Sequence, residues 1–353
     1  MSSAIRVGIL GASGYGAGEL LRLFVQHRQV EVVWVTSTSI GEPIARLHPH
    51  LRGFYDLHVV AGPDMDQLLA SEHAVIFSAL PHGLSGAAIE SVLREFADHP
   101  AASRLKILDF SGDFRLADET LHRQHYPESP PLPDCRRNFV YGLPELFADR
   151  VRTARFIANP GCLATAAILA AAPLITRAFT GTVAIDAKTG SSGSGRTLKE
   201  TTHHPTRHAD FRAYKPLAHQ HEPEILQAWG DPHGNRIHLS FVAQSLPTAR
   251  GIFVTAHATL PDESDTPTLR RVYESFYAGR PFVRVVDESP TLQDVVGSNF
   301  CDVAVTCRGR QVIAMAALDN LVKGMAGMAI QNMNLMCGLP ETEGLWTPSF
   351  RPV

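Results

Sequence analysis

Two kinds of hydrophobic pattern alternate along the first part of the chain. Nearly continuous apolar runs rich in β-branched residues are typical of strands covered on both faces. Four such runs occur, at residues 5–10, 30–36, 73–79 and 105–110. Between them, residues 18–27 and 85–97 place apolar side chains at helical spacing. This alternation of strand and helix predicts an α/β fold with a doubly wound parallel sheet.

The pattern changes after a proline-rich polar stretch at residues 126–138. Beyond residue 160, strand candidates follow one another with few helices between them, at residues 181–189, 236–245 and 251–260. This succession predicts a separate α+β domain with a mainly antiparallel sheet. Residues 318–339 again show helical periodicity, and we expect that helix to pack back on the first domain.

Chain length agrees with two domains, because 353 residues are too many for one ordinary hydrophobic core. We expect a first domain at residues 1–158, a second domain, also used for oligomerisation, at 159–317, and a returning C-terminal helix within 318–353. Large apolar sheets in such second domains often mediate subunit contacts, so we expect a homodimer or homotetramer.

Composition narrows the partners and the compartment. A formal net charge of −3 supplies no basic field for nucleic acid or anionic lipid. Five cysteines without regular spacing disfavour a disulfide framework or zinc finger and favour a reducing compartment. We find neither a signal peptide in residues 1–14 nor an apolar run long enough to span a bilayer, and therefore expect a cytoplasmic protein.

The stretch GILGASGYGAGELLRL, residues 8–23, places Gly11 and Gly14 directly between the first strand and the first helix. Glycine lets the backbone turn tightly beside a pyrophosphate, and the helix start offers free N–H groups. Ala17 stands where a third small residue lets the helix and strand pack closely. The pattern predicts a Rossmann-type dinucleotide site, with an ordinary tight turn as the alternative.

The end of the second strand bears on which dinucleotide binds. VTSTSIGEP, residues 35–43, has no acidic residue at the position that would bind a ribose 2′-hydroxyl. Ser37, Thr38 and Ser39 could instead hydrogen-bond a 2′-phosphate. The sequence therefore favours NADP over NAD.

Cys162 stands between a Pro-Gly turn and an alanine-rich apolar run in ANPGCLATAAILAAAPL, residues 158–174. If a helix begins at Asn159 or Pro160, the thiol lies in its first turn. Free N–H groups and the helix dipole there lower a thiol pKa and stabilise an oxyanion. Taken alone, such a cysteine is more often structural; the other four cysteines have no comparable setting.

A second stretch favours the catalytic interpretation of Cys162. In FRAYKPLAHQHEPEI, residues 211–225, Glu224 follows His219 and His221 at a spacing that would let its carboxylate orient an imidazole if a helix begins near Pro223. Arg212 and Lys215 precede them and suit a carboxylate or a phosphate. One exposed and one packed histidine on a strand would be the structural alternative.

A metal site is another use of these histidines, since His203, His204 and His208 lie nearby in the sequence. However, no cysteine or carboxylate falls at a recognisable ligand spacing, and hydride chemistry needs no metal. We therefore predict no bound metal.

Residues 186–204 contain a second loop rich in glycine and serine, around SSGSGR at 191–196. Its successive N–H groups could form an anion nest for a phosphate or line a nicotinamide. A flexible linker is the alternative, although a linker between two strands of one sheet would be unusual.

Seven motifs along the chain resemble those of N-acetyl-γ-glutamyl-phosphate reductase, a family of arginine biosynthesis related to aspartate-semialdehyde dehydrogenase. They are GASGYGAGELLRL, LPHG, DFSGDFRL, NPGC, SSGSGR, FRAYKPLAHQHEPEI and LDNLVKGMAG, in that order. The resemblance runs in register from residue 5 to about residue 345. It implies an NADP-dependent reductase that converts a small acyl phosphate to an aldehyde and releases phosphate.

The resemblance also implies residue roles. Cys162 would be the nucleophile and His221 the acid/base, with Glu224 behind it and His219 beside it. The residues implied at the cofactor are Gly11, Ala12, Ser13, Gly14, Tyr15, Gly16, Ser37, Ser39, Pro81, Ser192, Gly193, Gly195 and Asn320. Those expected at the substrate are Arg115, at the phosphate, Arg250, near a carboxylate, and Asn159, Arg212 and Lys215.

Three stretches depart from the family pattern. Leu163-Ala164-Thr165 stand where the family usually has Tyr-Pro-Thr. Residues 202–212 and 338–345 look more like sister enzymes that reduce α-aminoadipyl phosphate linked to a carrier protein in lysine biosynthesis. The reaction type is the same, but the acyl group stays open, and a small acidic carrier protein becomes a possible partner.

Two other classes of function use only part of the sequence. A cysteine hydrolase or acyltransferase built on Cys162 and His221 would leave the glycine turn unexplained. A non-catalytic sensor of the NADPH/NADP ratio would leave the cysteine and the histidines unexplained. Only a reductase uses both halves of the chain.

Overall fold

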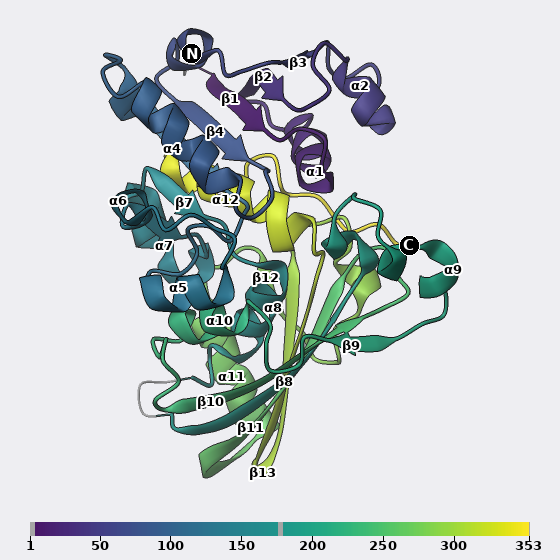
Figure 1. The fold of residues 1–353 in the computed structure, drawn as a ribbon. Helices are drawn as coiled ribbons and strands as arrows, with labels where there is room; N and C mark the ends of the chain where they lie inside the picture. The colour runs from purple at the N-terminus through teal and green to yellow at the C-terminus, as the bar shows by residue number, and fades with distance from the viewer. Residues whose placement is uncertain (1–3, 176–178, 353) are drawn as a thin grey trace. The chain divides into compact units, whose positions relative to one another are not determined.

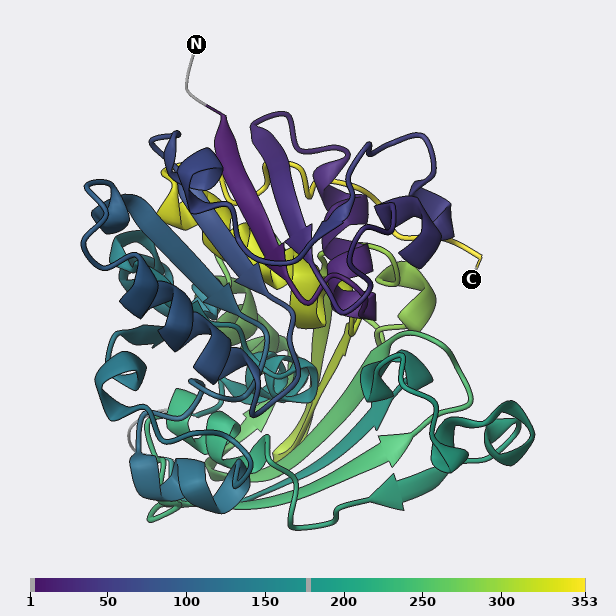
Figure 2. The ribbon, with the colours of Figure 1, turned by 45° about the horizontal axis from the view of Figure 1, so that its top comes forward.

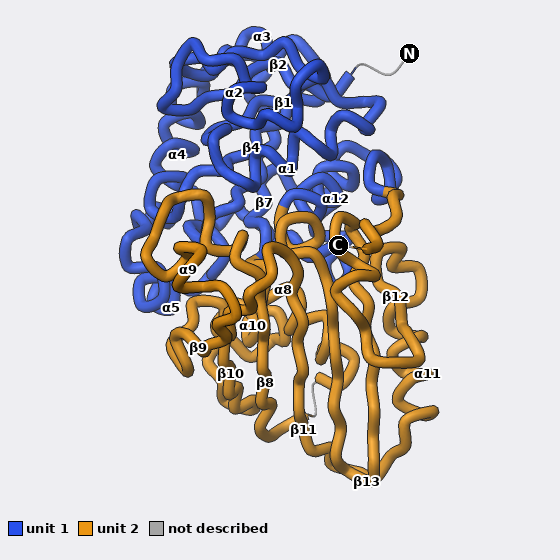
Figure 3. The backbone as a smooth tube through the Cα atoms, turned by 90° about the vertical axis from the view of Figure 1, so that its right-hand side faces the viewer, with its two compact units in different colours: residues 1–160, 326–345 blue, residues 161–325, 346–353 orange. Residues whose placement is uncertain are grey.

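The computed structural model describes residues 4–175 and 179–352, which form two compact units (Figure 3). Unit 1 comprises Met1–Pro160 and Ala326–Leu345, and unit 2 comprises Gly161–Met325 and Trp346–Val353. The domain limits expected from the sequence, at residues 158 and 317, stay a prediction, because compactness does not show which parts fold independently.

Unit 1 is built on a seven-stranded sheet in the order β3-β2-β1-β4-β5-β7-β6, and every pairing among its described strands is parallel (Figure 1). The strands are β1 (Ile5–Leu10), β2 (Val30–Thr36), β3 (Val59–Val60), β4 (Ala74–Ser78), β5 (Leu105–Asp109), β6 (Phe139–Tyr141) and β7 (Phe156–Ala158). The predicted doubly wound parallel sheet is confirmed. The order in which successive strands are added to the sheet reverses between β1 and β4. Parallel sheets of this kind bind ligands at such a point, at the carboxyl ends of the strands.

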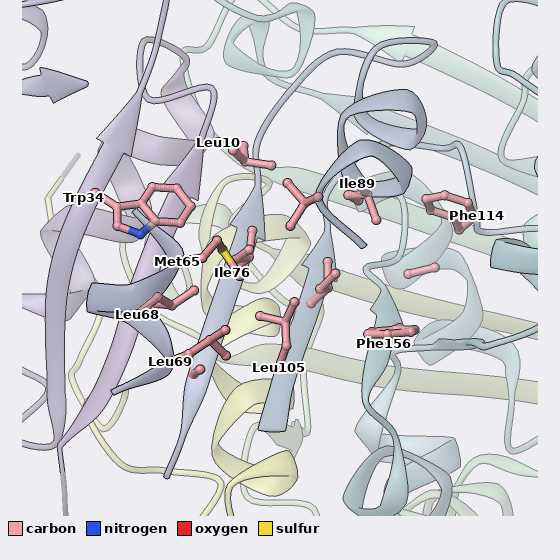
Figure 4. Packing of buried hydrophobic residues seen from close by; sticks show 14 residues of the cluster. Leu10, Trp34, Met65, Leu68, Leu69, Ile76, Ile89, Leu105, Phe114 and Phe156 are labelled. Carbon is pink, nitrogen blue, oxygen red and sulfur yellow. The ribbon is translucent and has the colours of Figure 1, made fainter. Parts of the chain in front are cut away.

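Helices cover both faces of this sheet. Those of unit 1 are α1 (Tyr15–Phe24), α2 (Ile44–Leu47), α3 (Met65–Leu69), α4 (Ser85–Glu95), α5 (Glu119–His125), α6 (Pro133–Arg136), α7 (Pro144–Thr153) and α12 (Gly327–Met336), with 3₁₀ turns η1 (Pro49–Leu51) and η2 (Ala102–Arg104). Figure 4 shows α3 and α4 contributing Leu68 and Ile89 to a cluster with Ile76 of β4. Phe77, the residue after Ile76 in β4, points to the opposite face. Its ring packs edge to face against that of Phe24 in α1, with the ring centroids 5.6 Å apart. Burial on both sides explains the continuous apolar runs of these strands.

The C-terminal helix is shorter than its periodicity indicates. The predicted segment 318–339 begins at the last residue of a strand, continues through a π-helical turn at Val322–Ala326, and becomes α12 only at Gly327. Within unit 1, α12 packs against α1, α7 and β5. Its buried amides hold neighbouring segments: Asn334 Nδ2 donates to the carbonyls of Glu341 and Glu343, at 3.2 and 2.9 Å.

Unit 2 contains a six-stranded sheet in the order β12-β13-β11-β8-β10-β9 (Figures 1 and 2). The strands are β8 (Gly181–Thr189), β9 (Arg212–Tyr214), β10 (Ile237–Ser245), β11 (Ile252–Asp265), β12 (Val283–Val285) and β13 (Cys301–Leu318). Three of the five pairings are antiparallel, which confirms a mainly antiparallel sheet, whereas β8–β10 and β12–β13 are parallel. The parallel pair β8–β10 is possible because the chain between these strands is a long crossover.

The helices of unit 2 position the residues discussed below. They are α8 (Cys162–Ala171), α9 (His204–Arg207), α10 (Glu222–Ala228) and α11 (Thr266–Phe276), with short turns η3 (Ser191–Ser194), η4 (Glu200–Thr202) and η5 (Leu292–Asp294). Helix α8 packs on β11 and β13, and α10 packs on α8. Residues 163–171 of α8 are all buried. Among the described residues, no helix has both the length and the apolar character needed to cross a membrane.

Close packing of β1 against β2 gives a stability prediction. A Cβ on Gly8 would lie 2.1 Å from the nearest carbon of the buried Trp34 indole. Because overpacking of this kind typically costs about 1–3 kcal/mol, Gly8→Ala should lower the free energy of the unfolding transition that exposes Trp34 by that amount. Urea unfolding followed by Trp34 fluorescence, with Trp229 and Trp346 replaced by Phe, would measure it.

Gly62→Ala is the matched control, since a Cβ there meets nothing within 4 Å. Its unfolding free energy should change by less than about 0.5 kcal/mol. Equal stability of the two variants would contradict the packing seen between Gly8 and Trp34.

Candidate active site

Cys162 is the first residue of α8, and Gly161 is its N-cap, with φ −67° and ψ 139°. The sequence places the helix start two or three residues too early, at Pro160 or Asn159, but the thiol does lie in the first turn. It is half-buried, unlike the fully buried residues that follow it in the helix. The N–H groups of a first turn lack intrahelical acceptors, and the positive helix end favours a thiolate over a thiol.

Glu224 connects the start of the cysteine helix to a histidine. Its side chain is fully buried in α10, and Oε2 accepts a hydrogen bond from the N–H of Gly161 at 3.0 Å. Its other oxygen, Oε1, lies 3.9 Å from Nε2 of His221. Helix α10 begins at Glu222 with His221 as its N-cap, close to the start expected at Pro223. The three-residue spacing therefore brings carboxylate and imidazole together, as the sequence predicts.

Two glycines allow close approach around Cys162. A Cβ on Gly161 would lie 2.3 Å from Nε2 of His221, so the imidazole packs directly on the backbone before the cysteine. A Cβ on Gly324 would lie 2.7 Å from Cβ of Cys162. Gly324 belongs to the π-helical turn Val322–Ala326, a feature frequent at functional sites. Gly324 lies in the motif LDNLVKGMAG, but the sequence alone indicates no role for it.

His219 supports the backbone of His221. It is 3% exposed, and its Nδ1 accepts the backbone N–H of His221 at 3.1 Å, so this nitrogen is unprotonated. Burial lowers the pKa of His219 to about 2, with smaller contributions from the charges of His221 and Lys215. A neutral, hydrogen-bonded imidazole orients its neighbour and is poorly suited to proton transfer near neutral pH. A catalytic role for His219 stays a prediction.

Tyr214 is a neighbour of His219 that the sequence did not single out, although it lies within the histidine-containing stretch at residues 211–225. Burial raises its pKa above the usual value, and the charge of Cys162 adds to the effect. Its ring meets that of His219 edge to face at 5.6 Å.

The glycine- and serine-rich loop after β8 is held in place by other segments. Ser192 donates from Oγ to the carbonyl of Ala249 at 2.7 Å and accepts from Nδ2 of Asn320 at 2.8 Å. Asn320 Oδ1 in turn accepts the N–H of Gly251 at 2.8 Å. The structure thus brings Ser192 and Asn320 together, with Gly193 beside them, and the loop is not a free linker.

Arg250 is oriented by a carboxylate that sequence reasoning did not single out. Its Nη1 lies 3.3 Å from Oδ2 of Asp319, which is fully buried and also accepts the N–H of Gly297 at 2.7 Å. Asp319 Oδ1 accepts the N–H of Leu321 at 2.8 Å, at the entry to the π-helical turn. One side chain therefore links Arg250 to the segment that packs on Cys162.

The other two cations expected at the substrate have local partners. Arg212 donates to the carbonyl of Thr201 at 2.9 Å and lies 3.6 Å from Asp210. Lys215 donates to Oε1 of Gln220 at 3.0 Å. Their contact with substrate stays a prediction.

In unit 1, the β1–α1 turn has the shape that a dinucleotide pyrophosphate requires. Gly11 has φ +82°, and a Cβ there would lie 3.0 Å from the backbone of Ala79. Gly14 is the N-cap of α1 without a side-chain cap, and space is open beside its Cα. The first-turn N–H groups of α1 therefore face the end of β1 as hydrogen-bond donors. The residues of this turn fit a dinucleotide pyrophosphate.

The remaining cofactor residues follow neighbouring strands. Ser37 and Ser39 follow β2, where the N–H of Ser39 lies 3.4 Å from Oγ of Ser37, and Pro81 follows β4 and is exposed. Because β2, β1 and β4 are adjacent and parallel, their carboxyl ends share one edge of the sheet. The structure brings these residues to that edge together with the glycine turn.

Arg115 and Asn159 are buried at the carboxyl ends of β5 and β7. Arg115 donates from Nε to the carbonyl of Asn159 at 2.8 Å and from Nη2 to that of Phe110 at 2.7 Å. Asn159 donates its backbone N–H to the carbonyl of Asp109, also at 2.8 Å. The guanidinium therefore joins two strand ends, and its contact with a phosphate stays a prediction.

The three histidines near α9 do not form a metal centre in the part of the chain that the structure describes. No group of three or more His, Cys, Asp or Glu side chains there is arranged to hold an ion. The rings of His204 and His208 are 5.3 Å apart.

Comparison with known proteins follows the same division of the chain. Residues 6–154 match the family model of the semialdehyde dehydrogenase NAD binding domain, and residues 162–320 match that of the semialdehyde dehydrogenase dimerisation domain. The chain belongs to the semialdehyde dehydrogenase family. It is therefore an oxidoreductase with an NAD(P)-binding domain, and the resemblance inferred from its motifs is confirmed.

Curated relatives span the whole chain of this semialdehyde dehydrogenase family member. The N-acetyl-gamma-glutamyl-phosphate reductase of Symbiobacterium thermophilum is 43% identical over 97% of both chains, and that of Methanosarcina mazei is 42% identical over 100% of both. A putative LysW-L-2-aminoadipate/LysW-L-glutamate phosphate reductase of Aeropyrum pernix is 40% identical over 100% of both.

Solved structures of the family share the fold at low sequence identity. Aspartate semialdehyde dehydrogenase II from Vibrio cholerae has a TM-score of 0.68 at 14% identity, covering 95% of this chain and 99% of that one. The Candida albicans aspartate semialdehyde dehydrogenase, solved with NADP, also has a TM-score of 0.68, at 13% identity, with the same coverage of both chains.

Gly161→Ala tests the packing of His221 against the cysteine helix. Alanine tolerates the backbone angles of Gly161, so the effect is steric: its methyl group would displace the imidazole. Because small displacements of catalytic groups can cost about 10²-fold, we expect a loss of that order in kcat with an unchanged circular dichroism spectrum. Gly62→Ala should keep full activity, and full activity of Gly161→Ala would contradict the arrangement.

Proposed function

We propose that the chain reduces N-acetyl-L-glutamyl 5-phosphate to N-acetyl-L-glutamate 5-semialdehyde with NADPH, releasing phosphate, in arginine biosynthesis. The reaction proceeds through a thioester on Cys162. The observation that supports this most directly is the buried Glu224 carboxylate, which binds the N–H preceding Cys162 and lies beside His221. Two curated relatives named N-acetyl-gamma-glutamyl-phosphate reductase, at 43% and 42% identity over almost the whole chain, support the choice of substrate.

Acylation uses the start of α8. The Cys162 thiolate attacks the acyl carbonyl, a carbon–sulfur bond forms, and the carbon–oxygen bond to phosphate breaks with the electron pair leaving on phosphate. First-turn N–H groups of α8 donate to the oxygen that becomes negative. Splitting the reaction in this way produces a thioester, which accepts a hydride far more readily than a carboxylate does.

Reduction of the thioester uses His221. NADPH, when bound, supplies the hydride. His221 donates a proton to the carbonyl oxygen as the tetrahedral thiohemiacetal forms and takes it back as the carbon–sulfur bond breaks to release aldehyde and thiolate. The nearby Glu224 carboxylate stabilises the imidazolium form, while its bond to Gly161 keeps the ring beside the cysteine helix.

NADP is the form of the cofactor that we propose. Residues 37–41, directly after β2, offer the Ser37 and Ser39 hydroxyls and no carboxylate, and the next acidic residue, Glu42, is paired with Arg46. This arrangement suits a 2′-phosphate and lacks an acidic group directly after the strand to bind a 2′-hydroxyl. The pyrophosphate would lie at Gly11–Gly14. Asn320 and the Ser192–Gly195 loop would contact the nicotinamide end.

Two arginines are proposed at the substrate. Arg250, oriented by Asp319, would bind the substrate carboxylate, because a guanidinium fixed by one carboxylate remains a directed donor for another. Arg115 would bind the leaving phosphate.

A second candidate substrate is an α-aminoadipyl or glutamyl phosphate linked to a small acidic carrier protein. The Aeropyrum pernix relative, 40% identical over the whole chain, favours it. The chemistry at Cys162 and His221 would be unchanged.

We also propose a homo-oligomer, a dimer or tetramer, that acts in the cytoplasm. The match of residues 162–320 to a dimerisation-domain model supports association through unit 2.

Cys162→Ser tests the covalent route. The variant should fold and bind NADPH but lose at least about 10³-fold in turnover, a typical scale for removal of a nucleophile. Cys135→Ser is the control: Cys135 is also half-buried, but burial raises its pKa to about 11, and it should keep full activity. Steady-state NADPH oxidation measures both; normal turnover of Cys162→Ser would exclude the thioester.

The reverse reaction tests the proposed substrate. With N-acetylglutamate semialdehyde and NADP, reduction of the cofactor should depend strictly on added inorganic phosphate, because phosphate must release the acyl group from Cys162. NADP should be preferred over NAD. Activity without phosphate would contradict an acyl-phosphate product, and activity only with a carrier-linked aminoadipate semialdehyde would establish the second candidate.

A further inference from the structure

His48 is a buried imidazole in contact with the β1–α1 turn. It follows α2 in the connection between β2 and β3 (Figure 1), is 5% exposed, and places Nε2 at 2.7 Å from the carbonyl oxygen of Ala12. A carbonyl oxygen only accepts hydrogen bonds, so Nε2 carries the proton and donates it. Neither the motifs nor the chemistry described above uses this side chain.

The opposite edge of the ring lies against helix α1. A Cβ on Gly18 would be 2.6 Å from Nδ1 of His48, so the imidazole occupies space that only a glycine leaves open. Glycine inside a helix is less stable than alanine by roughly 1 kcal/mol, which makes its presence in the middle of α1 informative. The packing of His48 against α1 explains why position 18 is a glycine.

The peptide groups of the turn are held from two sides. The N–H groups of Gly11 and Ala12 both donate to the carbonyl of Thr36 in β2, at 3.1 and 2.8 Å. The carbonyl of Ala12 points instead to His48. In a trans peptide the following N–H, that of Ser13, is directed opposite to this carbonyl, so the hydrogen bond from His48 determines which way the Ser13 N–H points.

We propose that His48 is a positioning residue of the dinucleotide site: its hydrogen bond to Ala12 sets the peptide plane that presents the turn's N–H groups to the pyrophosphate. This inference rests on the proposed function, which places NADP at that turn. The preorganised donors bind the anion without first reorienting, which lowers the free energy cost of binding.

The same connection also carries the residues proposed at the 2′-phosphate. Ser37 and Ser39 lie at its start, and the N–H of Gly41 donates to Val59 at 2.8 Å, joining that start to β3. Ile44 donates to Leu57 at 2.8 Å and accepts from His48 at 2.9 Å. Segment 37–59 therefore supports both ends of the adenosine portion of the cofactor, through its serines and through His48.

Three histidine variants test the role of the Nε2 donor. His48→Leu removes it, His48→Gln restores an N–H donor near the same position, and His50→Gln changes an exposed imidazole on the adjacent turn. For His48→Leu we expect the NADPH Kd and KM to rise roughly tenfold, the scale of one hydrogen bond, with kcat at saturating NADPH within about twofold. His48→Gln should recover most of the affinity, and His50→Gln should match the wild type.

Gly18→Ala reaches the same imidazole from the other side. Alanine favours the helix, so this variant should fold, but its methyl group displaces His48 and should raise the NADPH Kd as His48→Leu does. It keeps the proposal testable if His48→Leu does not fold. NADPH fluorescence titration gives Kd, and steady-state kinetics with saturating acyl phosphate separates KM from kcat.

Wild-type NADPH affinity in folded His48→Leu or Gly18→Ala would overturn the proposal, and so would equal losses in His48→Leu and His48→Gln. Absence of NADPH binding by the wild-type protein would overturn the proposed function as well. The two failures are therefore distinguished by the wild-type titration alone.

Discussion

A buried carboxylate provides the interaction on which the candidate active site depends. Glu224 has no exposed surface, so its carboxyl oxygens must find their hydrogen-bond partners within the protein, and the N–H of Gly161 is one of them. That N–H belongs to the N-cap of α8, one residue before the cysteine. The hydrogen bond thus couples the position of His221 to the helix that begins at Cys162.

The second constraint is the need for glycine where two segments of the chain approach each other closely, and it occurs in both units. Gly161 lets the His221 ring rest on the backbone, Gly324 lets the π-helical turn reach Cys162, and Gly18 admits His48 beside α1. In each case a methyl group would overlap the functional neighbour rather than its own backbone. These three glycines are needed because two segments approach each other closely. Gly11 in the β1–α1 turn differs from them, because it also has a positive φ.

Local sequence patterns predicted four of the seven strands in the sheet of unit 1, namely β1, β2, β4 and β5, together with α1 and α4. The apolar run at 5–10 coincides with β1, which is almost entirely buried, since strands covered on both faces leave little room for polar residues. The run at 30–36 coincides with β2, which is only partly buried. In unit 2 the longest strand, β13, was missed, because the polar stretch CRGRQ at residues 307–311 interrupts its apolar pattern where the strand is exposed. The parallel pairing of β8 with β10 also escaped prediction, as it depends on how a long crossover returns.

The sequence by itself determined which groups make up the candidate site: a cysteine at a helix start, a carboxylate three residues after a histidine, and a glycine turn between a strand and a helix. Each is a local pattern whose meaning depends on backbone periodicity. Only the tertiary structure decided the partners that lie far apart in the chain, namely Glu224 with Gly161, Asp319 with Arg250, and His48 with Ala12. These contacts arise from the packing of helices and loops on two sheets, and no local spacing records which distant backbone group a buried side chain will meet.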